Sequence, residues 1–128
     1  MTAENHAASL GDAPVLDRGV LTAHMNDLGV DLVRQIAEKY LDDAPASVAA
    51  VRAAAEAQDL PQLQKLIHRL GGGAQTVGLA ALSAQAKAAE HALRQGHAEE
   101  GLREATRLLA RVDSDLKTLA EFRDSLKG

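Results

Sequence analysis

Apolar residues recur every three or four positions along most of this chain, which is the spacing of one face of an α-helix. The expected helices span about residues 17–29, 31–58, 60–77, 80–94 and 99–126. Asp17, Asp31 and Asp59 suit the N-cap positions of the first three. Pro45 should either kink or restart the second. We find no alternating pattern that predicts a β-strand.

The composition favours packing these helices against one another. Hydrophobic residues make up 46% of the 128 residues and aromatic residues only 2%, so the core must consist mainly of Leu, Val, Ile and Ala. Short turns between helices favour antiparallel neighbours. We therefore predict an all-α fold, an antiparallel up-and-down four-helix bundle with a short leading helix. Residues 1–14 are small and polar and are expected to form a disordered tail, with the bundle over residues 15–126.

Charge and composition exclude several classes of function. The net charge of −4 argues against nucleic acid as a partner, because phosphate binding needs a basic surface. No stretch approaches the roughly 20 apolar residues of a membrane span, and the N-terminus lacks the pattern of a signal peptide. We expect a cytoplasmic protein that does not bind a membrane. No cysteine, histidine-pair or hydrolase motif is present, so neither a metal site nor hydrolytic chemistry is predicted.

Three consecutive glycines, residues 71–73, interrupt the helix predicted over residues 60–77. Each glycine costs a helix about 1 kcal/mol relative to alanine. One interpretation is that the helix ends there. However, Ala74 and Val77 continue the apolar pattern, and Gly78 suits the helix end. We therefore predict a continuous helix with a flat patch on its surface.

The same helix places a histidine in water beside the glycines. On a helical projection His68 lies about 140° from the apolar face, and Gly72 lies about 180° from it. Gln64 and Gln75 fall on the same outer stripe. The simplest interpretation is an ordinary solvated histidine. The flat patch favours another one, in which a second protein docks closely and reacts with the imidazole.

The segment from His68 to Gly78 resembles the signature of histidine-containing phosphotransfer (HPt) domains of two-component phosphorelays. That signature has a leucine two residues after the histidine, a glycine at the fourth position and another at the tenth, which are Leu70, Gly72 and Gly78 here. The resemblance extends over roughly residues 15–126. It implies a four-helix bundle and a phosphorylatable His68.

The resemblance also implies roles for the charged residues around the histidine. Glu90 would hydrogen-bond to the imidazole and orient it; the alternative is a surface carboxylate in weak helical ion pairs. The lysine usual three residues after the histidine is Gly71 here. Lys87 is the best substitute for its charge, ahead of the weaker candidates Arg69, Lys65 and Arg94. Alternatively, all four are solvated surface charges.

A receiver domain is the implied partner, and a hybrid histidine kinase is a further one. The docking surface should centre on Gly72, and its expected residues are Gly71, Gly72, Gln64, Lys65, Gln75 and Arg69. Apolar residues at its rim should come from among Val30, Leu32, Val33 and Ile36, and the spacing leaves open which of these four face outward. The resemblance implies that the receiver supplies the aspartate and a Mg²⁺ ion, whereas this chain binds no cofactor.

The expected function is that of a phosphorelay intermediate. His68 would accept a phosphoryl group from a receiver aspartate or a kinase and pass it to another receiver. Such a protein is not an enzyme with turnover of its own, and the sequence has no kinase ATP-binding motif. The family expectation is a monomer. The alternative function is a non-phosphorylated helical adaptor that binds a kinase or receiver, and Gly71 is its main support.

Overall fold

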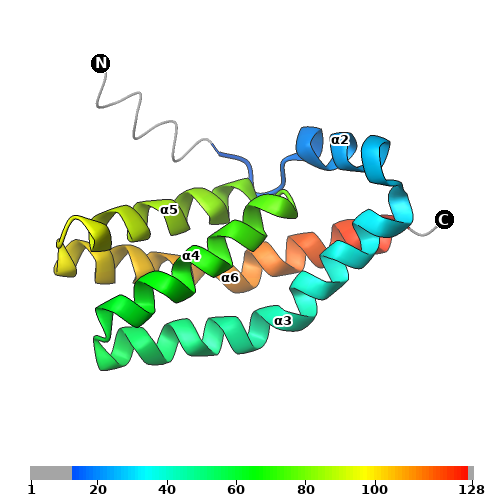
Figure 1. Ribbon diagram of the computed structural model, residues 1–128. Coiled ribbons are helices and arrows are strands. Elements are labelled where there is room, and N and C mark those ends of the chain that lie inside the picture. The colour runs from blue at the N-terminus through cyan, green and yellow to red at the C-terminus, as the bar shows by residue number, and fades with distance from the viewer. Residues whose placement is uncertain (1–12, 127–128) are drawn as a thin grey trace, which may run out of the picture.

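The computed structural model describes residues 13–126, and every regular element within them is an α-helix. The five helices are α2 (Arg18–Leu28), α3 (Val30–Ala57), α4 (Leu60–Thr76), α5 (Ala80–Arg94) and α6 (Ala98–Ser125) (Figure 1). The all-α prediction is therefore confirmed. Most of the predicted disordered tail, residues 1–12, lies outside the described residues. Pro14, at its end, accepts a hydrogen bond from the backbone N–H of Ala81 at 2.8 Å.

Local capping signals account for several of the helix ends. The Asp17 carboxylate accepts a hydrogen bond from the N–H of Val20, and the Asp59 carboxylate accepts one from Gln62. These bonds satisfy backbone donors that the first helical turn leaves free. Gly78 follows the end of α4 with φ of 78°, a left-handed conformation that glycine adopts without steric cost. The predicted boundaries therefore agree with the structure within a few residues.

In α3 one prediction needs revision, and one open alternative is decided. Asp31 is not an N-cap, because α3 already begins at Val30 and its cap is Gly29. Asp31 instead lies in the first turn, where a carboxylate interacts favourably with the helix dipole. Pro45 does not restart the helix, which continues through it to Ala57. Figure 1 shows α3 changing direction near its middle, as expected where proline removes a backbone donor.

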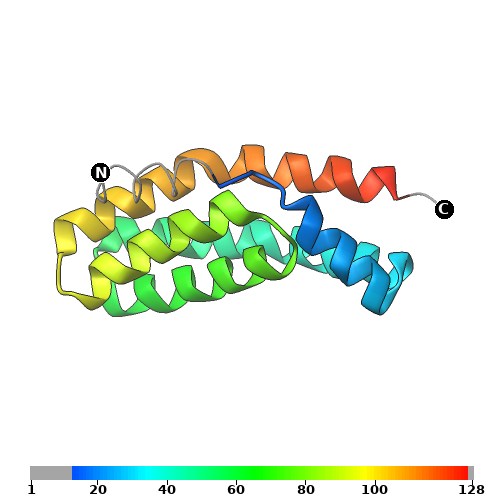
Figure 2. The ribbon, with the colours of Figure 1, turned by 90° about the horizontal axis from the view of Figure 1, so that it is seen from above.

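The four long helices form a ring in which each contacts the next. α4 and α6 both pack against α5, and α3 closes the ring by contacting α4 and α6. The views in Figures 1 and 2 show these neighbours running antiparallel, with α2 against the N-terminal part of α3. The α4–α5 edge of the bundle is consequently opposite the α3–α6 edge.

The core between these helices is aliphatic, as the composition predicts. Its fully buried members include Leu63, Ile67, Leu82, Leu108 and Leu119. One charged residue, Asp115, is also buried at 2% exposure, and Arg111 donates two hydrogen bonds to its carboxylate. Within the described range, no helix combines the length and the apolar character that a membrane span requires.

Candidate functional site

Helices α4 and α5 bring the predicted histidine and glutamate together. Nδ1 of His68 lies 2.8 Å from Oε2 and 3.0 Å from Oε1 of Glu90. The His68 side chain is 68% exposed, whereas that of Glu90 is 12% exposed. An ionised carboxylate can only accept hydrogen bonds, so this contact places the proton of the neutral imidazole on Nδ1. Nε2 then carries the lone pair, as a nucleophilic nitrogen must.

Glu90 has a second partner on its own helix. The guanidinium NH2 of Arg94 lies 2.6 Å from Oε2, the same oxygen that contacts His68. Arg94 follows Glu90 by one turn, a spacing at which side chains on a helix meet. The sequence suggested this helical pairing but gave Arg94 only a minor role. In the structure the carboxylate is shared between the imidazole and the guanidinium.

The three glycines of α4 have different surroundings. A Cβ at Gly71 would lie 2.6 Å from the Cβ of Ala86 on α5, and a Cβ at Gly73 would lie 2.5 Å from Cε1 of Tyr40 on α3. Both distances are far shorter than real contacts allow. A Cβ at Gly72 would meet no atom within 4 Å. The predicted flat patch therefore reduces to Gly72.

The prediction that Gly71 contributes to the docking surface is wrong. Gly71 is buried between α4 and α5, where the missing side chain allows the two helices to approach closely. A lysine at this position would have to begin its side chain inside that contact. Packing against Ala86 thus gives a structural reason for the departure from the family pattern.

The other predicted surface residues of α4 do reach the surface. Lys65, Arg69 and Gln75 are exposed and Gln64 is half-buried. Lys87 on α5 is exposed too, and it lines a depression of about 260 Å³ that also includes Gln75. The ion pairs found for Glu90 within residues 13–126 involve His68 and Arg94 and not Lys87.

Apolar side chains are exposed where α2 meets α3. Leu28, Val30 and Leu32 are 47%, 42% and 41% exposed, which is unusual for such large apolar residues in a small bundle. Two other predicted rim residues differ from them. Val33 is buried in the core, which removes it from the four candidates, and Ile36 is half-buried.

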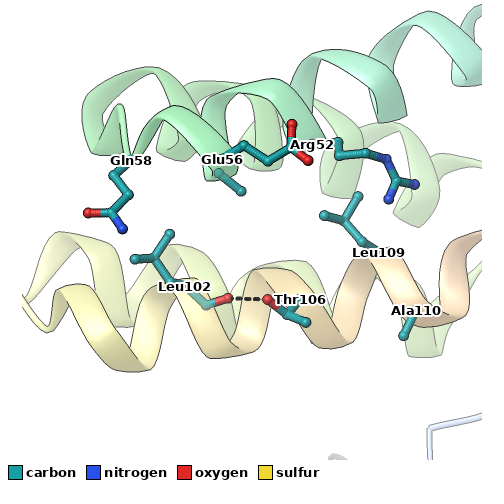
Figure 3. A pocket seen from close by; sticks show the side chains of 8 residues that line it. Arg52, Glu56, Gln58, Leu102, Thr106, Leu109 and Ala110 are labelled. Atoms are coloured by element: carbon teal, nitrogen blue, oxygen red, sulfur yellow. Dashed lines mark hydrogen bonds between the residues drawn. The ribbon is translucent and has the colours of Figure 1, made fainter.

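A groove of about 520 Å³ lies elsewhere, between α3 and α6. Arg52 and Glu56 from α3 and Leu102 and Leu109 from α6 line it (Figure 3). Because the α3–α6 edge is opposite the α4–α5 edge, this groove and His68 are on different sides of the bundle. Among the described residues, no three His, Asp or Glu side chains are grouped so that they could share a metal ion.

Comparison with known proteins identifies the family. The family model of the Hpt domain matches residues 35–126, well over half of the chain and all of α4, α5 and α6. The match begins inside α3, so it is shorter than the region of roughly 15–126 suggested by the resemblance. No curated protein and no solved structure gives a significant match. The matched region contains His68, Glu90 and the open Gly72, and the chain belongs to the Hpt domain family of phosphotransfer modules in two-component signalling.

Proposed function

We propose that this chain is a phosphorelay intermediate whose phosphoryl acceptor is Nε2 of His68. The observation that carries the proposal is the contact between His68 Nδ1 and Glu90, which leaves the Nε2 lone pair free on an exposed ring. Nε2 would form an N–P bond with the phosphoryl group of a receiver aspartyl phosphate. The O–P bond breaks and the aspartate leaves as a carboxylate. Attack by a second receiver aspartate would reverse these steps.

Glu90 supports this reaction by holding the imidazole. When Nε2 bonds to phosphorus while Nδ1 keeps its proton, positive charge develops on the ring. The Glu90 carboxylate, already in place at 2.8 Å, would stabilise that charge without reorganising. Its role is therefore both to orient the nucleophile and to stabilise the phosphorylated state.

Docking would bring the receiver over the α4–α5 edge. Gly72, one turn beyond His68, leaves clearance for the approaching partner, and the exposed Lys65, Arg69 and Gln75 surround it. The half-buried Gln64 lies at the border of this surface. The exposed apolar corner of Val30 and Leu32 could add affinity at the rim. In this proposal the receiver, or a hybrid histidine kinase that carries one, provides the aspartate and Mg²⁺, and this chain needs no cofactor.

The charge of the phosphoryl group also needs a cation. Lys87 is exposed on α5, one turn before Glu90, and is proposed to take the place of the lysine that Gly71 replaces. The adaptor alternative depended mainly on that replacement. Close packing of Gly71 against Ala86 explains the glycine at this position. The replacement of the lysine is therefore compatible with a protein that still transfers phosphate.

The proposal is tested by transfer from phosphorylated receivers of the source organism. We expect a cognate receiver to label the wild-type chain with acid-labile phosphate and His68→Gln to remove the label. His97→Gln is a matched control, because His97 is a 62% exposed histidine beside a carboxylate, Glu100, at 3.4 Å. Labelling of His68→Gln at the wild-type level would contradict the proposal. Failure of every receiver to label the wild-type chain would favour the adaptor.

A further inference from the structure

The Glu90 carboxylate connects the phosphoacceptor histidine to an arginine. Oε2 lies 2.8 Å from His68 Nδ1 and 2.6 Å from Arg94 NH2. The carboxylate is 12% exposed, whereas the arginine is 58% exposed. A carboxylate so nearly buried interacts strongly with whichever cation lies beside it. The arginine is therefore part of the electrostatic environment of the imidazole, because it contacts the carboxylate that contacts the ring.

The charge of Arg94 offsets the negative charge that Glu90 presents to the imidazole. An arginine stays protonated at any ordinary pH, so it compensates the carboxylate permanently. The guanidinium therefore remains beside Oε2 whichever form the imidazole adopts.

The position of the carboxylate matters as well as its charge. A histidine without a fixed partner can carry its proton on either nitrogen. The arginine contacts Oε2, the same oxygen that contacts the ring, and so limits rotation of the Glu90 side chain. A carboxylate fixed in this way keeps the proton on Nδ1.

We infer that Arg94 is a positioning residue that acts through Glu90 and keeps the proton of the neutral His68 imidazole on Nδ1. The inference rests on the proposed function for its purpose, since the Nδ1–H form is the one that can accept a phosphoryl group on Nε2. Arg94 itself contacts neither the phosphorus nor the acceptor nitrogen in this account.

The test is nitrogen NMR of the ¹⁵N-labelled full chain at neutral pH, which distinguishes the two neutral forms of the His68 ring from its protonated form. We expect Arg94→Gln to lower the ratio of the Nδ1–H form to the other forms roughly two- to fivefold, the range of a partly exposed ion pair. Arg94→Lys should restore part of the ratio, because it keeps the charge but not the planar fork.

Arg107→Gln is the matched control for this experiment. Arg107 is 62% exposed and pairs at 3.1 Å with Glu104, whose side chain is 14% exposed, but this pair does not contact His68. The Arg107→Gln substitution should therefore leave the NMR spectrum of His68 unchanged. An unchanged spectrum in Arg94→Gln, or an equal change in Arg107→Gln, would overturn the inference.

A second arm measures the rate of phosphoryl transfer from a phosphorylated receiver. Arg94→Gln should slow transfer by the factor by which it lowers the population of the Nδ1–H form. Arg94→Lys should recover part of both the population and the transfer rate. A normal transfer rate despite a changed spectrum would overturn the link between the Nδ1–H form and transfer and leave the proposed function intact. Failure of the wild-type chain to accept phosphate would instead overturn the proposed function, while the spectra still decide whether Arg94 positions the ring.

Discussion

At the residue scale, the three consecutive glycines of α4 serve different purposes. Gly71 allows close contact with Ala86, Gly73 makes room for the ring of Tyr40, and Gly72 faces open space. The free-energy cost of a glycine in a helix is similar at all three positions. The packing consequences of replacing the three glycines differ, and the free energies of unfolding of the variants measure this difference.

Substitution of two adjacent glycines by alanine should change stability in opposite directions. Gly71→Ala should lower the free energy of unfolding by about 1–3 kcal/mol, because the new Cβ would force α4 and α5 apart. Gly72→Ala should raise it by up to about 1 kcal/mol, since the site is open and alanine favours the helix. Urea unfolding measures both values.

The contact with Ala86 provides a control for this prediction. Ala86→Gly removes the atom that a Cβ at position 71 would meet. Combined with Gly71→Ala, it should recover part of the loss caused by the single substitution. If Gly71→Ala is as stable as wild type, the close approach of the two helices is not what selects glycine there.

The sequence predicted only part of this site. The helical period showed that His68 and Gly72 face outward, because the direction of a side chain on a helix follows from its position alone. The neighbours of Gly71 and Gly73 lie on α5 and α3, so no local pattern reveals them. The tight pairing of Arg94 with the oxygen that contacts His68 likewise depends on how α4 and α5 are arranged.

At the element scale, Tyr40 ties α3 to the helix that carries His68. Its hydroxyl donates a 2.9 Å hydrogen bond to the carbonyl of Leu70, and its ring lies against Gly73. Tyr40→Phe should therefore lower the free energy of unfolding by about 0.5–1.5 kcal/mol, the usual net value of such a bond. Thermal or urea unfolding at neutral pH measures the loss, and a phenylalanine variant as stable as wild type would contradict it.

The same tyrosine should make stability depend on alkaline pH. Burial, and secondly the negative charge of Asp115, raise the pKa of Tyr40 above its ordinary value near 10. The folded state therefore keeps the proton that the unfolded state releases, and stability is lost as the pH rises above about 10. We expect the free energy of unfolding to fall more steeply between roughly pH 10 and 12 in wild type than in Tyr40→Phe. Parallel curves would contradict this account.

Helix boundaries were the most predictable feature at this scale. Caps such as Asp17 and Asp59 act on backbone groups within their own first turn, so the sequence around them contains the whole signal. Passage of α3 through Pro45 and burial of Asp115 beside Arg111 depend on neighbouring helices. Neither could be decided from spacing along one helix.

At the scale of the whole molecule, the bundle has two opposite edges with different properties. The α4–α5 edge has His68, Glu90 and the open Gly72, and the α3–α6 edge has the groove of Figure 3. The order of helices in the bundle separates these edges. Docking of a receiver at His68 should therefore tolerate changes in the groove.

A pair of glutamine substitutions tests this separation. Gly72→Gln should reduce the rate of transfer from a phosphorylated receiver by about tenfold or more, because a clash worth 1.4 kcal/mol already gives that factor. Ala110→Gln adds the same side chain at an exposed position in the groove and should leave transfer unchanged. Circular dichroism should show both variants folded. Equal rates for Gly72→Gln and wild type would show that the partner does not approach over Gly72.

The central claim is that His68 accepts phosphate on Nε2 because Glu90 occupies Nδ1. Its most direct test is to phosphorylate the chain with a cognate receiver and to locate the phosphate by NMR at alkaline pH, where phosphohistidine persists. We predict a single modified residue, His68, with phosphorus bonded to Nε2 and the Nδ1 proton retained. Phosphate on Nδ1, on another residue, or on none would contradict the claim.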